Sequence, residues 1–174
     1  GGTLTNCVNL ASAEIYSNGS ATSNYNVAGI TGSTALNSAN LYNCDNYGHI
    51  NQVKASGGVT QVGGINGYGY RFGTIDGCDN FGTITFAGTG TSKNGNVGGI
   101  VGKDLNGLYK HCWYQILPTT STGVEGKEYV GGILGYAKYS KLQFCSVFSY
   151  KYDYSDSAKY LSSLKVNGVD KPAD

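Results

Sequence analysis

The stretch Val62-Gly63-Gly64-Ile65-Asn66-Gly67 recurs three more times in this chain, and the recurrence decides the fold. The other copies are Val27-Ala28-Gly29-Ile30-Thr31-Gly32, Val97-Gly98-Gly99-Ile100-Val101-Gly102 and Val130-Gly131-Gly132-Ile133-Leu134-Gly135. Successive copies are spaced by 35, 35 and 33 residues. A fixed period of this length is typical of repeat architectures, in which equivalent residues of neighbouring repeats stack. The sequence therefore predicts stacked repeats rather than a compact enzyme domain with one central site.

A second pattern, centred on the cysteines, alternates with the first. Its clear copies are Leu4-Thr5-Asn6-Cys7-Val8-Asn9, Leu41-Tyr42-Asn43-Cys44-Asp45-Asn46 and Ile75-Asp76-Gly77-Cys78-Asp79-Asn80, with weaker copies around Cys112 and Cys145. Because a cysteine that occurs once per repeat has no partner within its own repeat, we expect a column of small, buried, reduced thiols. A zinc site of four thiolates would need paired C-x-x-C spacing, which does not occur, so we expect no metal.

Both patterns predict corners in the chain. The valine and isoleucine of the first pattern stand three apart, which a regular strand would send to opposite faces, so the glycine pair between them must form a bend. We expect its second glycine, such as Gly64, and its last, such as Gly67, to need either positive φ or a close backbone approach. Asn6, Asn43 and Gly77 precede the cysteines and tolerate a left-handed conformation, so the chain should turn there too.

Other residues recur once per repeat and predict further columns. The asparagines two residues beyond the cysteines should hydrogen-bond to one another along a half-buried row. They are Asn9, Asn46 and Asn80. An aromatic or aliphatic column comprises Leu10, Tyr47, Phe81 and Phe148, and Ile50 and Ile84 form another. Such columns are what stacking of repeats requires.

The fold class follows from these patterns and from the composition. The 28 glycines and 15 tyrosines, with 2 prolines and no methionine, favour strands and turns over helices. We predict an all-β protein, a β-solenoid of four to five tandem repeats of about 34–37 residues with glycine-rich corners. The repeat domain covers residues 1–154, and residues 155–174 form a cap or tail. Alternation of Phe148, Tyr150, Tyr152 and Tyr154 with polar residues predicts a capping strand, and residues 156–164 a short helix.

Charge and hydropathy exclude some partners. Charged residues make up 13% of the chain and the net charge is +1, so no basic field exists to hold a phosphate backbone, and we expect no nucleic-acid partner. No apolar run of 18 residues occurs, so no transmembrane helix is expected. The chain lacks an initial methionine and opens inside a repeat, from which we expect it to be part of a longer chain.

The two alternating patterns resemble a known family. The V-G-G-I-x-G segments, alternating with L-x-N-C-x-N elements over residues 4 to about 148, resemble the GLUG-motif repeats of bacterial surface and secreted proteins. Those repeats occur in IgA-specific metallopeptidases and in adhesin-like proteins. The resemblance implies an extracellular, secreted or surface-attached repeat region. It transfers no catalytic residues, and the H-E-x-x-H zinc motif of metallopeptidases is absent.

Tyrosines are the candidate ligand-binding residues. Tyr42 and Tyr109 each follow the leucine of their repeat, although Tyr109 is one residue out of register with its cysteine. Tyr68 and Tyr136 share the position just after the V-G-G-I-x-G segment. Rows of such residues offer rigid aromatic faces with polar edges, which suit sugars or a protein partner. The alternative is that these tyrosines only cover loops.

Two aspartates and two histidines are the candidate catalytic groups. Asp45 and Asp79 share one repeat position and should lie about 5 Å apart with one coil per repeat, or twice that with two. Either separation is near the range of the paired carboxylates of glycosidases, although two solvated aspartates are more often plain polar surface. His49 and His111 occupy different repeat positions, which indicates surface or turn residues rather than a ligand pair.

The function that these observations favour is a non-enzymatic extracellular repeat module. It would act as a spacer and adhesive surface, bind a host or matrix glycan or protein, and use no cofactor. The alternative is a carbohydrate-active enzyme, a polysaccharide lyase or glycoside hydrolase, which rests on fold analogy because β-solenoids also carry such enzymes.

Overall fold

The structure, a computed structural model, describes residues 2–18, 25–34, 39–54, 60–70, 73–86, 95–116 and 129–149. Within these ranges the chain forms strands and turns and no helix. The predicted strand beyond residue 149 and the predicted helix over residues 156–164 lie outside the described residues. The described part is therefore all-β, as the composition predicts.

Each repeat contributes one layer of short strands. The first layer contains β1 (Thr3–Thr5), β2 (Val8–Asn9), β3 (Glu14–Asn18), β4 (Tyr25–Ala28) and β5 (Thr31–Thr34). The second contains β6 (Asn40–Tyr42), β7 (Asp45–Asn46), β8 (His49–Lys54), β9 (Thr60–Gly63) and β10 (Asn66–Tyr70). The third contains β11 (Thr74–Asp76), β12 (Asp79–Asn80), β13 (Ile84–Phe86), β14 (Gly95–Gly98) and β15 (Val101–Leu105). The fourth contains β16 (Leu108–Lys110), β17 (Trp113–Ile116), β18 (Tyr129–Gly131) and β19 (Leu134–Lys138), and the last β20 (Lys141–Gln143) and β21 (Ser146–Ser149).

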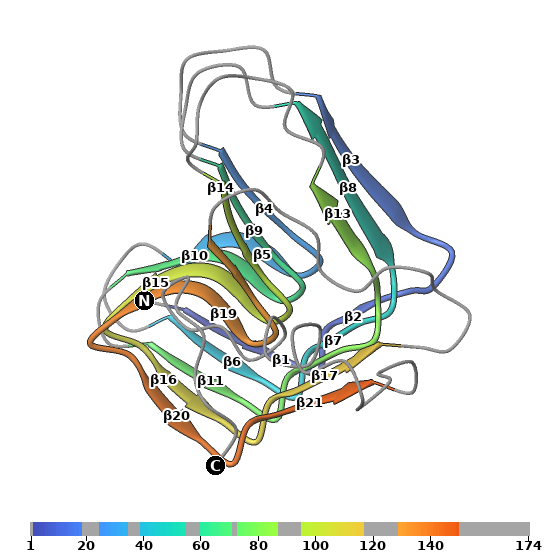
Figure 1. Ribbon diagram of the computed structural model, residues 1–174. Helices are drawn as coiled ribbons and strands as arrows, with labels where there is room; N and C mark the ends of the chain where they lie inside the picture. Colours follow the sequence, from blue (N-terminus) through green and yellow to red (C-terminus); the bar gives the residue numbers. More distant parts are fainter. Residues whose placement is uncertain are drawn as a thin grey trace.

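Equivalent strands of successive layers pair in parallel and form five sheets (Figure 1). In the order in which the chain visits them they are sheet 1 (β1, β6, β11, β16, β20), sheet 2 (β2, β7, β12, β17, β21), sheet 3 (β3, β8, β13), sheet 4 (β4, β9, β14, β18) and sheet 5 (β5, β10, β15, β19). Each strand pairs with its counterpart one repeat away, so neighbouring repeats are one strand spacing apart. Parallel sheets built in this way are compatible with the predicted β-solenoid.

Two clusters of buried side chains fill the interior. The larger joins sheets 1 and 5 with the column of cysteines, and includes Leu41, Ile75, Cys78 and Val101. The smaller lies between sheets 3 and 4, which stand side by side in the upper part of Figure 1. It consists of Ile50, Ile84, Val62 and Val97. The predicted column of Ile50 and Ile84 is therefore confirmed, and the two residues are direct partners in the pairing of β8 with β13.

The asparagine column forms as predicted. Asn9 Nδ2 donates to Asn46 Oδ1 at 2.7 Å, and Asn46 Nδ2 donates to Asn80 Oδ1 at 2.8 Å. Asn80 Nδ2 in turn donates to the carbonyl oxygen of Gly99 at 2.7 Å. Asn46 and Asn80 are fully buried, and these bonds offset the cost of removing their amides from water.

The residue before each cysteine turns the chain through a left-handed conformation. Its φ is 57° at Asn6, 51° at Asn43, 61° at Gly77, 48° at His111 and 56° at Phe144. The corner predicted from asparagine and glycine is thus confirmed. It also occurs in the two weaker copies. There it is occupied by histidine, which is enriched in this conformation, and by phenylalanine, for which it is unusual.

The glycine corner works by close approach rather than by positive φ. A Cβ atom at Gly64 would overlap the Gly99 carbonyl oxygen and the Asn80 side chain. At Gly67 it would lie 2.6 Å from the Gly32 carbonyl oxygen and 2.8 Å from the Val27 nitrogen. Among the glycines of the described ranges only Gly77 has positive φ. The structure therefore shows that close approach of neighbouring backbone, and not positive φ, is why glycine is needed at Gly64 and Gly67.

The last described strand extends sheet 2. Ser146–Ser149 forms β21, which pairs in parallel with β17 and adds a fifth strand to sheet 2. Phe148 pairs there with Gln115, so the fourth repeat carries glutamine in the column predicted to hold Leu10, Tyr47, Phe81 and Phe148. Residues 146–149 therefore continue the stack, and the rest of the predicted capping strand, residues 150–154, lies outside the described residues.

We expect Gly64→Ala to destabilise the protein by at least about 2 kcal/mol, because the added methyl must displace backbone of the next layer. Gly2→Ala is the matched control, since a Cβ there meets nothing within 4 Å. Denaturant unfolding followed by circular dichroism measures both free energies of unfolding. Equal stabilities for the two variants would contradict this account of the corner.

Candidate functional site

Tyr68 and Tyr136 lie in one row across sheet 5. The row runs through Ser33, Tyr68, Lys103 and Tyr136, which are successive partners in the pairing of β5, β10, β15 and β19. The shared position predicted for the two tyrosines is therefore confirmed. With one layer between them, their backbones are roughly 10 Å apart.

Alternation of side chains along β10 turns Tyr68 and Tyr70 outward. Gly69 faces the interior, where a Cβ atom would overlap Asp104 Oδ1, so Tyr68 and Tyr70 on either side of it project to the other face. The rings of Tyr68 and Tyr70 stack with centroids 6.2 Å apart and an interplanar angle of 26°. Partial burial raises the pKa of Tyr68, with smaller contributions from Tyr70 and Asp104, which keeps its hydroxyl protonated and able to donate.

Lys103 lies between the two tyrosines of the row. Its Nζ is 5.7 Å from the ring centroid of Tyr68 and 5.5 Å from that of Tyr136. Both distances are within the reach of a cation–π interaction, which is worth about 0.5–1 kcal/mol at an exposed site. The two rings thus favour a position of the ammonium group between them.

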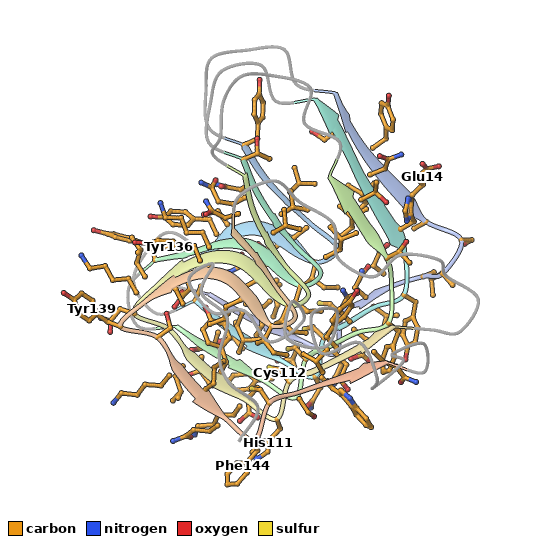
Figure 2. All side chains as sticks on the ribbon, in the orientation of Figure 1. Glu14, His111, Cys112, Tyr136, Tyr139 and Phe144 are labelled. Carbon is orange, nitrogen blue, oxygen red and sulfur yellow. The ribbon has the colours of Figure 1, made fainter. Side chains whose placement is uncertain are left out.

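A second lysine and tyrosine extend this surface to the end of β19. Lys138 Nζ is 5.1 Å from the ring centroid of Tyr139. Lys138 pairs with Leu105, which pairs with Tyr70, and these three residues form the next outward row of sheet 5. Figure 2 shows Tyr136 and Tyr139 on one side of the molecule and Glu14 on the opposite side. We call this surface the tyrosine–lysine face. It consists of Tyr68, Tyr70, Lys103, Tyr136, Lys138 and Tyr139.

Asp104, between Lys103 and Leu105 in β15, points into the interior. It is 2% exposed and accepts hydrogen bonds from the Gly107 backbone N–H at 2.6 Å and from the Ser140 hydroxyl. The Tyr109 hydroxyl also contacts it, and burial, together with the negative charge of Asp104, holds the pKa of Tyr109 well above its usual value. The only carboxylate among the described residues of β5, β10, β15 and β19 is therefore turned away from the tyrosine–lysine face.

The row expected for Tyr42 and Tyr109 does not form. Tyr109 is 2% exposed and pairs with Ile75 and Leu142, so it occupies the apolar column of sheet 1 inside the larger core. Tyr42 pairs with Asp76 and is half-buried. The two tyrosines differ in burial because the inward column is formed by the residue three positions before each cysteine. That residue is Tyr109 in the fourth repeat but Leu41 in the second.

Asp45 and Asp79 share one row of sheet 2. Asp45 pairs with Val8, Asp79 pairs with Trp113, and the strands of the two aspartates are neighbours. Their backbones are therefore one strand spacing apart, about 4.8 Å. Burial raises the pKa of Asp79; a hydrogen bond from the Trp113 N–H at 2.8 Å opposes the rise, and the charge of Asp45 adds to it. Sequence reasoning gave no sign of this raised pKa.

Aromatic residues flank this pair of aspartates. The rings of Tyr47 and Phe81 stack with centroids 4.8 Å apart and planes inclined by 12°. They follow Asn46 and Asn80 in the chain, and Trp113 is exposed beside Asp79. The sheet therefore offers two carboxylates next to exposed aromatic surface.

The two histidines lie on different parts of the structure. His49 begins β8 in sheet 3, where its Nδ1 contacts the Thr83 hydroxyl. His111 is an exposed corner residue that pairs with Asp76 at 2.8 Å and stacks on Phe144, as Figure 2 shows at the lower end of the molecule. In the part of the chain that the structure describes, no group of three or more His, Cys, Asp or Glu side chains is placed to hold a metal ion.

All five cysteines are free and lie in one column, as predicted, but they differ chemically. Cys44, Cys78 and Cys112 are buried, and burial raises the pKa of Cys78 to about 12. Cys145, at the edge of the last layer, is half-buried, and a hydrogen bond from Cys112 lowers its pKa. The repeat pattern does not indicate these differences in burial and pKa, because they depend on whether a cysteine lies in an inner layer or in the last one.

We expect iodoacetamide at neutral pH to modify Cys145 well before Cys44, Cys78 and Cys112, because thiolate is the reactive form and the other three are buried. Peptide mass spectrometry after timed quenching gives the five rates. Cys112→Ala should slow modification of Cys145 and move its pH profile upward, since the donated hydrogen bond is lost. Uniform rates in the native protein, or an unchanged profile in the variant, would contradict the assignment.

A pocket of about 240 Å³ adjoins the tyrosine–lysine face. Tyr139 of that face lines it, together with Asn106 from the end of the third layer and Leu108 and Lys141 from the starts of the fourth and last layers. This volume is below the roughly 300–1,000 Å³ of most ligand pockets, so it suits one substituent of a ligand.

No family model, no characterised protein and no solved structure matches this chain. Among the described residues, no helix is long and apolar enough to cross a membrane.

Proposed function

We propose that this chain is a β-solenoid that acts outside the cell as a non-enzymatic repeat module of a bacterial surface or secreted protein, with the tyrosine–lysine face as its ligand-binding surface. The observation that carries the proposal is the row of Tyr68, Lys103 and Tyr136, in which two aromatic rings hold a cation at an outward position of sheet 5. The resemblance to GLUG-motif repeats supports the extracellular setting.

The chemistry of this row suits an adhesive contact. Tyrosine presents a rigid apolar ring with a hydroxyl at its edge, so it contributes contact area and a hydrogen bond at a low cost in conformational entropy. The rest of sheet 5 is supported by the packed interior, which keeps the row at a fixed spacing. A host or matrix glycan or a protein partner is the ligand class that fits such a surface, and the layers themselves serve as a spacer.

The test is binding to an array of glycans and extracellular-matrix proteins. Tyr68→Ala combined with Tyr136→Ala should weaken the strongest interaction by about tenfold or more, because truncating a central aromatic anchor costs more than about 1 kcal/mol. Tyr16→Ala is the control, since Tyr16 is 58% exposed but lies in sheet 3. Unchanged binding by the double variant, with circular dichroism showing the same fold, would remove this face as the site.

A carbohydrate-active enzyme is the second candidate, favoured by the raised pKa of Asp79 one strand away from Asp45. In a retaining glycosidase one carboxyl is protonated and donates to the leaving oxygen, and a carboxylate about 5–5.5 Å away attacks the sugar. In this candidate Asp79 would be the acid, and Asp45, whose backbone is one strand spacing away, would be the nucleophile.

If this candidate is correct, turnover of at least one glycan will fall by about 10²-fold or more in Asp79→Asn, because general acid catalysis is lost. The rate will also fall as pH rises through the pKa of Asp79, since only its protonated form donates. Reducing-sugar release measures both. Asp76→Asn, which removes a carboxylate from sheet 1, should leave the rate unchanged, and a wild-type protein without turnover on the whole panel excludes the candidate.

A further inference from the structure

We infer that the tyrosine–lysine face selects an anionic glycan, with Lys103 as the residue that recognises its carboxylate or sulfate groups. This inference rests on the proposed function and names the ligand class of the same site. Four features of the face support it: the setting of Lys103, the placement of the carboxylates, the spacing of the rings and the adjoining pocket.

Lys103 has the setting of a recognition group rather than of a structural ion pair. Its ammonium lies between the rings of Tyr68 and Tyr136, at 5.7 and 5.5 Å from their centroids. The ion pair found among the described residues joins His111 and Asp76 on sheet 1, so no carboxylate of the described part neutralises Lys103. Because the rings restrict its movement, the lysine loses less conformational freedom when an anion binds.

The charged side chains that the structure describes on and beside the tyrosine–lysine face are lysines. Lys138 stands in the next outward row of sheet 5, and Lys141 lines the adjoining pocket. The described carboxylates lie elsewhere: Asp104 points inward, Asp76 is in sheet 1, Asp45 and Asp79 are in sheet 2, and Glu14 is in sheet 3. Among the described residues, this face and its adjoining pocket thus carry lysines and no outward carboxylate, which complements an anionic ligand.

The spacing of aromatic rings favours a sugar chain over other polyanions. Tyr68 and Tyr136 are two layers apart, roughly 10 Å, with the lysine in the layer between them. A pyranose ring presents an apolar face of C–H groups that stacks on a tyrosine ring, and hydroxyls that reach its polar edge. Three lysines are too few to hold nucleic acid, whose binding depends on neutralising many phosphates.

The pocket beside Tyr139 supplies a second polar contact. Its volume of about 240 Å³ and its lining by Asn106 and Lys141 suit a single acidic substituent of a chain that lies across the face. The glycan would therefore meet Lys103 on sheet 5 and Lys141 at the start of β20 in sheet 1.

Paired polymers that differ only in charge test the inference. Polygalacturonate and chondroitin sulfate are compared with their carboxyl-reduced and desulfated, carboxyl-reduced forms by biolayer interferometry on the whole chain. The wild-type protein should bind the acidic member of a pair at least about tenfold more tightly, and the difference should shrink between about 0.05 and about 0.3 M salt.

Lys103→Gln keeps most of the stem and removes the charge, so the preference should fall to within about twofold while the neutral polymer still binds. Lys103→Arg should retain the preference, because a guanidinium also interacts with aromatic rings and anions. Lys110→Gln is the matched control, since it removes a lysine from sheet 1, and it should behave as the wild type.

The outcomes separate the two proposals. Equal binding of acidic and neutral polymers by the wild type, or a preference that survives in Lys103→Gln, overturns the choice of an anionic glycan and leaves the proposed function standing. Binding of polyglutamate but of none of the sugars overturns the sugar class in favour of an acidic polypeptide. Absence of binding to any glycan, polypeptide or matrix protein overturns both.

Discussion

Pairing of each strand with its counterpart one repeat later is the constraint on which the rest of this structure depends. Parallel pairing in register places equivalent side chains about 4.8 Å apart, so every inward position becomes a column and each member is covered by its neighbours. Leu41 and Ile75, in inner layers, are 1% and 4% exposed, whereas Leu4 and Leu142, in the first and last described layers, are 41% and 40% exposed. Burial in this protein therefore comes from stacking between layers.

The same constraint links the two sequence patterns, which lie on different sheets. Gly29 leaves room for the Asn46 side chain, and Gly64 leaves room for that of Asn80, each in the following layer. In the next layer the column changes to Tyr114, and Gly99 leaves room for its ring, since a Cβ there would lie 2.6 Å from ring carbons. The glycine corner thus tolerates either an amide or an aromatic ring, because the space depends on the missing Cβ and not on the hydrogen bond.

Much of the interior could be predicted from the sequence because stacking repeats one residue type at one position. The cysteine column, the asparagine bonds and the left-handed corner at Asn43 all follow from a period in the mid-thirties. A match on leucine groups Tyr109 with Tyr42 although Tyr109 is one residue out of register with its cysteine. Its distance of three residues to Cys112 indicates the inward column instead. The repeat pattern gives no indication of Lys103, because the residue type changes from layer to layer in its row, from serine to tyrosine, lysine and tyrosine. The pKa values of Asp79 and Cys145 depend on burial and on contacts between layers, which the repeat pattern does not carry.

The inward columns could be predicted and the outward rows could not, and one physical reason explains both. An inward column must be filled by side chains of matched size and polarity, since one mismatched member leaves a void or an unsatisfied group between two layers. An outward row carries no such requirement, so its residues vary from layer to layer at little cost in stability, as Ser33, Tyr68, Lys103 and Tyr136 do. Recognition in a stacked protein therefore falls to the rows that break the repeat. The inward columns, which keep the repeat, set the distances at which those rows meet a ligand.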